Sequence, residues 1–444
     1  MKKRFFGTDG IRGKTGEHPI TPDFFVKLAY ATGLVLTKHH KSKNNPSVVI
    51  GKDTRISGYM FESALEAGFS AAGVDTYLTG PIPTPGIAYL TQKLDADIGV
   101  SITASHNPFG DNGIKIFTKN GTKLSEETEI EIEQLLDEAL VLVTTAKLGK
   151  ARRLDDAYDR YIRFCLNTVS NELDFKHYKI VIDCANGATY HVAPKIFRSL
   201  GAKIITINNS PDGLNINEAA GSDHPESLVQ AVKKNQANLG IAFDGDGDRI
   251  LVVNNDGSII DGDQILFIIL NYFQQQQKLK GGLVGTLMTN LALEEKCAEM
   301  NISFYRAKVG DRYVAEALRE KEWMIGGENS GHIVLLNYHS TGDGIISALQ
   351  LLSALEVNKM SLSEALANFS LYPQQLINIP IKEKLDLDSQ IIKDLVKEAE
   401  MIMEGKGRVL IRPSGTQPLL RIMTEGPEKL LVVKAANYLA KAIN

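Results

Sequence analysis

Three aspartates at alternate positions form the most specific local pattern in this 444-residue sequence. Asp244, Asp246 and Asp248 are separated by glycines and follow an apolar run at residues 239–243, which predicts a buried strand. Glycine allows the backbone angles of a tight loop, and carboxylate oxygens are ligands that suit Mg²⁺. The pattern therefore predicts a site for one magnesium ion, with an acidic turn between strands as the alternative.

A second pattern places a hydroxyl group beyond another predicted strand. Ser105 and His106 follow residues 97–102, and the loop after the carboxyl end of a strand is where α/β proteins place reactive groups. Lys115 comes shortly afterwards and could act as a general acid or base if its pKa were lowered. Taken alone, the segment is also compatible with a turn. A Ser-His-Asp hydrolase is disfavoured, because the sequence has no Gly-x-Ser-x-Gly motif.

Two further loops carry groups that suit a sugar and a phosphate. Glu328 and Ser330 lie in a glycine-bracketed segment, residues 326–332, where they could hydrogen-bond to neighbouring sugar hydroxyls. Residues 412–418 combine arginine, hydroxyl side chains and backbone amides, which together can cradle a phosphate. A hairpin turn and a surface turn are the respective alternatives. The residues of the predicted phosphate cradle are Arg412, Ser414, Gly415, Thr416 and Arg421.

Spacing excludes two other binding motifs. An EF-hand calcium loop beginning at Asp244 would need Gly and Glu at its sixth and twelfth positions, which here are Arg249 and Asn255. The glycine-rich segment at residues 7–15 is close to a Walker A loop, but Gly7 lies six residues before Gly13 where five are required. We therefore do not expect binding of a nucleoside triphosphate.

The elements that must position these loops alternate between short β-branched runs and helical patterns, which is typical of parallel α/β sheets. Strands are predicted at residues 47–51, 74–78, 97–102, 179–183, 203–207 and 239–243. Helices are predicted at residues 22–38, 58–73, 84–94, 261–276, 291–300 and 310–321. After about residue 370 the pattern changes to a small α+β domain, with strands near 371–381, 408–411 and 419–425 and helices near 388–404 and at the end of the chain. The acidic run at residues 126–138 is expected to be a solvated helix face.

Composition limits the class of protein. A chain of 444 residues is too long for one hydrophobic core, so several domains are expected. The net charge of −4 argues against a nucleic-acid partner, and no apolar run approaches the length of a membrane span. The three cysteines are far apart and odd in number, which favours a reducing compartment. The basic start of the chain lacks the apolar run of a signal peptide, so a soluble cytoplasmic protein is expected.

Taken in order with residues 6–13, the four loops resemble the α-D-phosphohexomutase superfamily over essentially the whole chain. The resemblance implies three similar α/β domains with mixed sheets around a central cleft, plus a smaller C-terminal α+β domain. The implied domains are residues 1–153 with the serine loop, 154–255 with the metal loop, 256–369 with the sugar loop and 370–444 with the phosphate loop. Residues 309–314 also resemble the glucosamine branch of the superfamily, whereas Asn329 and Gln417 replace the glutamine and glutamate that are usual there.

The resemblance implies a reaction through a covalent intermediate. Ser105 would carry a phosphoryl group that one Mg²⁺ per chain bridges to the three aspartates. Transfer of this group to glucosamine 6-phosphate would give a 1,6-bisphosphate, which turns over and returns its other phosphate to Ser105. Glucosamine or glucose 1,6-bisphosphate would act as an activator. The product, glucosamine 1-phosphate, would supply the amino-sugar precursor of UDP-N-acetylglucosamine and of peptidoglycan in the cell wall.

The same resemblance assigns roles to the remaining residues. Lys115 would transfer protons, with His332 as a lesser candidate, and Arg12 and Arg249 would stabilise charge near the reacting phosphate. The implied ligands of the substrate are Glu328 and Ser330 for the sugar, and Arg412, Ser414, Gly415, Thr416 and Arg421 for the non-reacting phosphate. A small-molecule sugar phosphate would be the partner, and the protein would be a monomer or a homodimer.

Three alternatives remain open at this point. A phosphomannomutase or phosphoglucomutase of the same superfamily would use the same mechanism on another sugar. A haloacid-dehalogenase-type enzyme would use Asp244 itself as the nucleophile, but the hydroxyl residue that such enzymes need further along is Asp248 here. A non-catalytic sugar-phosphate-binding protein is disfavoured, because Ser105, Lys115 and all three aspartates are present.

Overall fold

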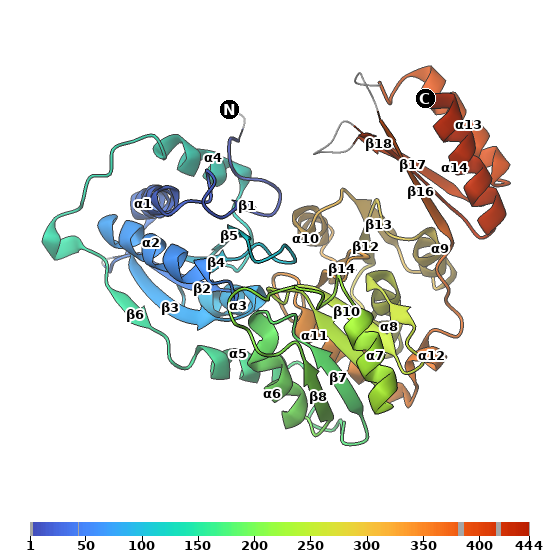
Figure 1. Ribbon diagram of the computed structural model, residues 1–444, viewed down its shortest axis with the longest axis horizontal. Coiled ribbons are helices and arrows are strands. Elements are labelled where there is room, and N and C mark those ends of the chain that lie inside the picture. The colour runs from blue at the N-terminus through green and yellow to red at the C-terminus, as the bar shows by residue number, and fades with distance from the viewer. Residues whose placement is uncertain (1–2, 43, 381–385, 414–418, 444) are drawn as a thin grey trace.

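Four β-sheets follow one another along the chain, and we call the regions built on them domains I to IV (Figure 1). The structure is a computed structural model that describes residues 3–42, 44–380, 386–413 and 419–443. Domains I and IV lie on opposite sides of the molecule in Figure 1, with domains II and III between them. Among the described residues, no helix has both the length and the apolar character that crossing a membrane requires.

Domain I has a six-stranded sheet in the order β1-β5-β4-β2-β3-β6, in which β3, β2 and β4 run parallel. Its strands are Ile11–Lys14 (β1), Ser47–Lys52 (β2), Asp75–Pro81 (β3), Ile98–Ile102 (β4), Asp111–Thr118 (β5) and Ala151–Arg153 (β6). Its helices are Pro22–His39 (α1), Ser57–Ala71 (α2), Thr84–Lys93 (α3) and Glu126–Leu135 (α4). β5 runs antiparallel to β4, and β1 runs antiparallel to β5.

Domains II and III have sheets in the orders β11-β10-β9-β7-β8 and β13-β12-β14-β15. The strands of domain II are Lys179–Asp183 (β7), Lys203–Ile207 (β8), Leu239–Phe243 (β9), Ile250–Asn254 (β10) and Ile259–Ile260 (β11), and its helices are Ala157–Leu166 (α5), Val192–Ser199 (α6) and Glu226–Asn235 (α7). The strands of domain III are Leu283–Thr286 (β12), Phe304–Ala307 (β13), Ile325–Gly327 (β14) and Ile333–Leu335 (β15). Its helices are Gly262–Gln275 (α8), Leu291–Glu299 (α9), Asp311–Glu320 (α10), Gly344–Asn358 (α11) and Leu362–Ala365 (α12).

Domains I to III share one strand arrangement. Three parallel strands are followed by an antiparallel one, so that β3-β2-β4-β5, β8-β7-β9-β10 and β13-β12-β14-β15 correspond. The loop between the last two strands of each set carries one predicted functional segment, at residues 103–110, 244–249 and 328–332. Because each loop follows the carboxyl end of a parallel strand, the repeated fold presents three equivalent ligand-binding positions.

Domain IV has a different, all-antiparallel sheet in the order β16-β18-β17. Its strands are Gln374–Pro380 (β16), Arg408–Pro413 (β17) and Leu419–Glu425 (β18), and its helices are Gln390–Ile402 (α13) and Lys429–Ile443 (α14). It has a hydrophobic core of its own, formed by α13 and α14 against the sheet. The predicted α+β domain is thus confirmed, and the phosphate loop at residues 414–418 lies outside the described residues.

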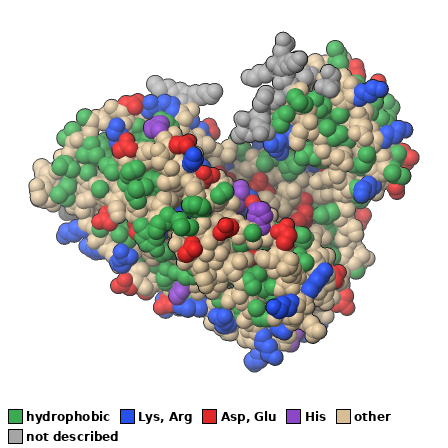
Figure 2. All heavy atoms as spheres, viewed as in Figure 1, with side chains coloured by type: hydrophobic (Ala, Val, Ile, Leu, Met, Phe, Trp, Pro, Cys, Tyr) green, Lys and Arg blue, Asp and Glu red, His purple; other side chains and the backbone are tan. Residues whose placement is uncertain are grey.

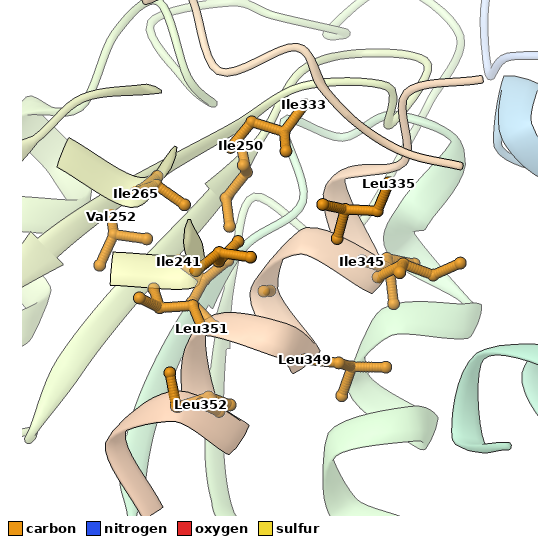
Figure 3. Packing of buried hydrophobic residues seen from close by; sticks show 14 of the residues in the cluster. Ile241, Ile250, Val252, Ile265, Ile333, Leu335, Ile345, Leu349, Leu351 and Leu352 are labelled. Atoms are coloured by element: carbon orange, nitrogen blue, oxygen red, sulfur yellow. The ribbon is translucent and has the colours of Figure 1, made fainter. Parts of the chain in front are cut away.

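One hydrophobic core joins domains II and III and reaches α3 of domain I. Helix α11 is buried along almost its whole length, as expected for a helix that is apolar on all sides. In Figure 3, its residue Leu351 lies near Ile241 of β9, and its residue Ile345 lies near Leu335 of β15. This shared core connects the first three domains, whereas most of domain I packs around a second hydrophobic core of its own.

The structure confirms most predicted elements and corrects one. Strands β7, β8, β9 and β18 have the predicted bounds, whereas the sequence patterns did not predict β1 or β5. The acidic helix α4 is not simply a solvated face, since Glu129 and Glu133 are only 3% and 4% exposed. Glu129 pairs with Arg312 of α10, and Glu133 accepts backbone N–H groups near the N-terminus. The acidic run thus contributes to the contact between domains I and III.

Candidate active site

Ser105 and the aspartate loop meet at the boundary between domains I and II. The Ser105 hydroxyl donates a hydrogen bond of 2.6 Å to Asp244 Oδ2, and Nδ1 of His106 lies 3.4 Å from the same hydroxyl. Ser105 and Asp244 are each only 1% exposed. The fold therefore brings the predicted nucleophile and the predicted metal ligand into direct contact.

The three aspartates form a compact, buried anionic group. One carboxylate oxygen from each residue lies within 4.8 Å of those of the other two. Burial, followed by the charges of Asp248 and Asp246, raises the pKa of Asp244 well above its ordinary value. Asp246 Oδ1 and Asp248 Oδ1 are buried without a hydrogen-bond partner. Since buried, unsatisfied carboxylate oxygens are costly, this group could hold a hard cation with oxygen ligands.

Lys115 lies on β5 and binds the aspartates rather than the serine. Its Nζ donates to Asp246 Oδ2 at 2.9 Å and to Asp248 Oδ2 at 2.8 Å. Burial alone would lower the pKa of Lys115, but these carboxylates raise it well above the ordinary value. The lowered pKa that a general base would need is thus not found. In these ion pairs the Lys115 ammonium group neutralises charge on the aspartates.

Residues near the N-terminus build a charged network beside the aspartates. Arg12 of β1 pairs with Asp9, and Lys123 Nζ lies 2.6 Å from carboxylate oxygens of both Asp9 and Asp311. Arg249 donates its backbone N–H to Asp244 Oδ1 at 3.1 Å. The Nε atoms of Arg12 and Arg249 are buried without a hydrogen-bond partner. Two unsatisfied cationic donors beside the aspartates suit an anionic substrate.

The predicted sugar loop lines a cavity of about 280 Å³ beside this network. Glu328 and Ser330 both line it, and Glu328 Oε1 accepts the backbone N–H of Gly310 at 3.0 Å. His332 is buried at the base of the loop, with Nδ1 3.7 Å from Asp248 Oδ1. Burial would lower the pKa of His332, but Asp248 raises it. The structure therefore brings the sugar loop next to the metal loop.

The described part of the predicted phosphate cradle is an arginine pair on two adjacent strands. Arg412 of β17 and Arg421 of β18 are directly opposed in the antiparallel register. Like charges in opposed positions are unfavourable, and Arg421 Nε is also buried without a hydrogen-bond partner. A bound phosphate would offset both costs. Ser414, Gly415 and Thr416 lie outside the described residues.

The face shown in Figure 2 is hollowed between domain I and domain IV. Acidic and histidine side chains are visible at the base of the hollow, and basic side chains lie on the wall formed by domain IV. The hollow is open to solvent. It can therefore admit a small, charged molecule to the functional loops of domains I to III.

Sequence reasoning missed several polar residues that support the site. Thr84, at the start of α3, donates a hydrogen bond of 2.7 Å to Asp246 Oδ2. Arg55, just beyond β2, and Asn217, in a loop of domain II, donate hydrogen bonds to the Ser105 carbonyl, and Asp53 in turn binds Arg55. The signal was available only for Asp53 and Arg55, which are charged residues directly after a predicted parallel strand.

Comparison with known families matches each of the four domains. The matched descriptions are Phosphoglucomutase/phosphomannomutase alpha/beta/alpha domain I at residues 3–140, domain II at residues 158–257, domain III at residues 261–372, and the C-terminal domain at residues 376–442. The chain therefore belongs to the phosphoglucomutase/phosphomannomutase family of the α-D-phosphohexomutases, and it is a mutase. The fold predicted from the sequence resemblance is confirmed.

The curated relatives with high sequence identity to this chain are named phosphoglucosamine mutase. Phosphoglucosamine mutase of Methylobacillus flagellatus is 54% identical over 447 residues, covering 100% of this chain and 99% of the relative. Phosphoglucosamine mutase of Aeromonas hydrophila is 52% identical with the same coverage of both chains. Among solved structures, a putative phosphomannomutase from Thermus thermophilus has a TM-score of 0.81 at 23% identity, covering 99% of both chains. N-acetylphosphoglucosamine mutase from Aspergillus fumigatus, solved with GlcNAc-6P and magnesium, has a TM-score of 0.67 at 17% identity, covering 100% of this chain and 96% of that one.

Proposed function

We propose that the protein interconverts glucosamine 6-phosphate and glucosamine 1-phosphate, with Ser105 carrying the phosphoryl group. The observation that carries the mechanism is the 2.6 Å hydrogen bond between the Ser105 hydroxyl and Asp244, buried between two domains. The amino-sugar substrate is supported by relatives named phosphoglucosamine mutase at 51–54% identity over the full chain. An assay with glucosamine 6-phosphate, Mg²⁺ and glucose 1,6-bisphosphate tests the proposal: product should form only with Mg²⁺, and it should form faster when the bisphosphate is added.

The reaction runs in two half-reactions at one serine. In the first, the 1-hydroxyl of glucosamine 6-phosphate attacks the phosphorus of phosphoserine, the P–Oγ bond of Ser105 breaks, and glucosamine 1,6-bisphosphate forms. The intermediate then turns over, and Ser105 Oγ attacks the 6-phosphate. The bond between phosphorus and the sugar 6-oxygen breaks, which leaves glucosamine 1-phosphate and regenerates phosphoserine. One nucleophile thus serves both ends of the sugar.

Charge on the protein determines how the other residues act. Mg²⁺ held by Asp244, Asp246 and Asp248 would polarise the phosphoryl group. Lys115 is the first candidate for passing the proton of the attacking hydroxyl to the oxygen that leaves phosphorus, and His332 is the second. The unsatisfied guanidinium Nε atoms of Arg12 and Arg249 stabilise charge on the reacting phosphate. Glu328 and Ser330 hold the sugar, and the loop of Ser414, Gly415 and Thr416 with Arg412 and Arg421 holds the other phosphate.

Several broader features of this proposal remain predictions. The domain boundaries at residues 153, 255 and 369, the monomeric or homodimeric state and the activation by glucosamine or glucose 1,6-bisphosphate belong to them. The three cysteines are free and buried, which favours a reducing compartment such as the cytoplasm. The product would supply the precursor of UDP-N-acetylglucosamine for cell-wall synthesis.

The first test of this proposal concerns the choice of sugar. We expect a higher kcat/KM for glucosamine 6-phosphate than for mannose 6-phosphate, because the Glu328 carboxylate favours a cationic amine near it. A hydrogen bond to a charged group contributes about 1.5–3 kcal/mol, so Glu328→Gln should lower kcat/KM for the amino sugar roughly ten- to a hundredfold. The loss for glucose 6-phosphate should be smaller. Equal efficiencies for all three sugars in the wild type would assign the protein to the mannose/glucose branch.

The second test concerns the arginine pair of domain IV. Arg412→Ala removes one charged donor from the predicted phosphate cradle, which should weaken the affinity for the non-reacting phosphate about ten- to a hundredfold. The bisphosphate should then dissociate between the half-reactions and leave Ser105 without phosphate. KM should rise, and the activity should depend more strongly on added bisphosphate. Quenched single turnovers of phosphorylated enzyme should release measurable glucosamine 1,6-bisphosphate. Wild-type KM with no extra leakage would mean that these arginines are only part of a turn.

A further inference from the structure

Arg55 is a buried residue that hydrogen-bonds to the backbone of the loop carrying Ser105. Its side chain is fully buried, and it follows β2 on the loop adjacent to the one that carries Ser105. Each of its guanidinium nitrogens is bonded: Nε donates to Asp53 Oδ2 at 2.8 Å, Nη1 to the carbonyls of Pro108 and Asp111, and Nη2 to the carbonyls of Ser105 and Asn107 at 3.0 and 2.7 Å. A single side chain thus binds four carbonyl groups of one short loop. A buried charge is tolerated here because every donor is satisfied.

Asn217, which belongs to domain II, binds the same carbonyl groups of Ser105 and Asn107. Its Nδ2 donates to the carbonyl oxygens of Ser105 and Asn107 at 2.8 and 2.9 Å. Each of these oxygens therefore accepts one hydrogen bond from Arg55 of domain I and one from Asn217 of domain II. A carbonyl oxygen has two lone pairs, so both acceptors are fully used. The position of the serine backbone is defined from both sides of the domain boundary.

The backbone of Ser105 needs such support. Its φ of +52° lies in the left-handed region, which is unfavourable for a residue with a side chain. Its N–H donates to Thr103 Oγ1 at 2.8 Å, and that hydroxyl donates in turn to Asp53 at 2.8 Å. The Ser105 carbonyl oxygen also lies so close to Gly245 that a Cβ at residue 245 would be only 2.6 Å away. The serine is therefore held against the metal loop by specific contacts rather than by packing alone.

We propose that Arg55 and Asn217 are positioning residues for phosphoryl transfer, which act by fixing the Ser105 carbonyl and thereby the direction of its Oγ. The inference rests on the proposed function, because it assumes that Ser105 carries the phosphoryl group. Neither side chain touches the Ser105 hydroxyl, whose described contacts are with Asp244 and His106. The two residues act through the backbone, so they affect the rate of transfer at Ser105 rather than the binding of the sugar.

Asn217→Gly is the most direct test, because Asn217 is only partly buried, its side chain carries no charge, and its φ of +59° is one that glycine adopts without strain. Enzyme is first phosphorylated with glucose 1,6-bisphosphate and Mg²⁺, which intact mass verifies, and then mixed with glucosamine 6-phosphate in single turnovers. Misplacing a reacting group by about 1 Å can cost a hundredfold in rate, so we expect transfer to slow about ten- to a hundredfold. KM and the melting temperature should remain close to those of the wild type.

Arg55→Lys keeps the charge but cannot reach four carbonyls, so transfer should slow in this variant as well. Because both residues hold the same two carbonyls, the double variant should lose less than the product of the two single losses. Asn235→Ala removes another amide of domain II that donates to a backbone carbonyl, and it should transfer at the wild-type rate. This control separates the general effect of losing a side-chain amide from the loss of the hydrogen bond to the Ser105 carbonyl.

Two failures can be told apart. A wild-type enzyme that never gains phosphate on Ser105 would overturn the proposed function and the positioning role with it. A phosphorylated wild type together with an Asn217→Gly variant that transfers at the full rate would overturn only the positioning role. A slowed variant whose KM rises in proportion, or whose melting temperature falls sharply, would assign Asn217 to folding or substrate binding instead.

Discussion

Ser105→Ala is expected to lose at least about a thousandfold in kcat and to lose all covalently bound phosphate, because the variant has no oxygen to carry the phosphoryl group. Intact mass should find part of the wild-type protein heavier by one phosphate and none of the variant. Ser105→Ala removes the 2.6 Å hydrogen bond to Asp244 Oδ2, but Asp244 Oδ1 still accepts the backbone N–H of Arg249, which keeps the aspartate in place. The variant should therefore fold and still bind the sugar phosphate, and kcat rather than KM should change.

The chemistry of the adduct distinguishes Ser105 from Asp244. Phosphoserine is an ester that survives acid, whereas an aspartyl phosphate is cleaved by hydroxylamine. Ser63→Ala removes an exposed hydroxyl on α2 of the same domain and should keep both the phosphate and the activity. A hydroxylamine-labile adduct that persists in Ser105→Ala would instead identify Asp244 as the nucleophile, as in a haloacid-dehalogenase-type enzyme.

The parts of the fold that the sequence predicted well are those with uniform local patterns. β7 and β9 are short, β-branched or apolar and almost wholly buried, so their bounds were evident. β5 was missed because it begins with Asp111, Asn112 and Gly113, which favour turns. Pairing with β4 and β1 on its two sides overrides that local preference.

The charge states of the site residues also depend on contacts that the local sequence does not show. The aspartate loop, Ser105 and Lys115 were identified from residue types, but the sign of the pKa shift of Lys115 depends on which groups surround it. Two buried carboxylates from another domain raise this pKa, and no local pattern reports their presence. Glu129 appeared to be on a solvated face for a similar reason, because its partner Arg312 is 183 residues away in sequence. Long-range partners decide the charge state, and only the fold supplies them.

Removal of divalent metal is expected to abolish turnover reversibly. Metal polarisation of a phosphoryl group contributes several kcal/mol, and about 4 kcal/mol corresponds to roughly a thousandfold in rate. Enzyme treated with EDTA and then desalted should therefore lose about three orders of magnitude in kcat, and Mg²⁺ should restore it. A metal ion that binds the folded protein but not the unfolded chain also stabilises the folded state. Mg²⁺ should thus raise the melting temperature of the treated protein by a few degrees, even without substrate.

The aspartates can be tested as the site of this effect with a matched pair of variants. Asp246→Asn removes one carboxylate whose Oδ1 is buried and unsatisfied, so it should lose both the rescue by Mg²⁺ and the rise in melting temperature. Asp256→Asn changes an exposed aspartate in the turn after β10, only ten residues further on, and should respond like the wild type. A thermal response to Mg²⁺ that is retained in Asp246→Asn would locate the ion elsewhere. Full activity after chelation would mean that Lys115, which already neutralises Asp246 and Asp248, meets the need for positive charge without a metal.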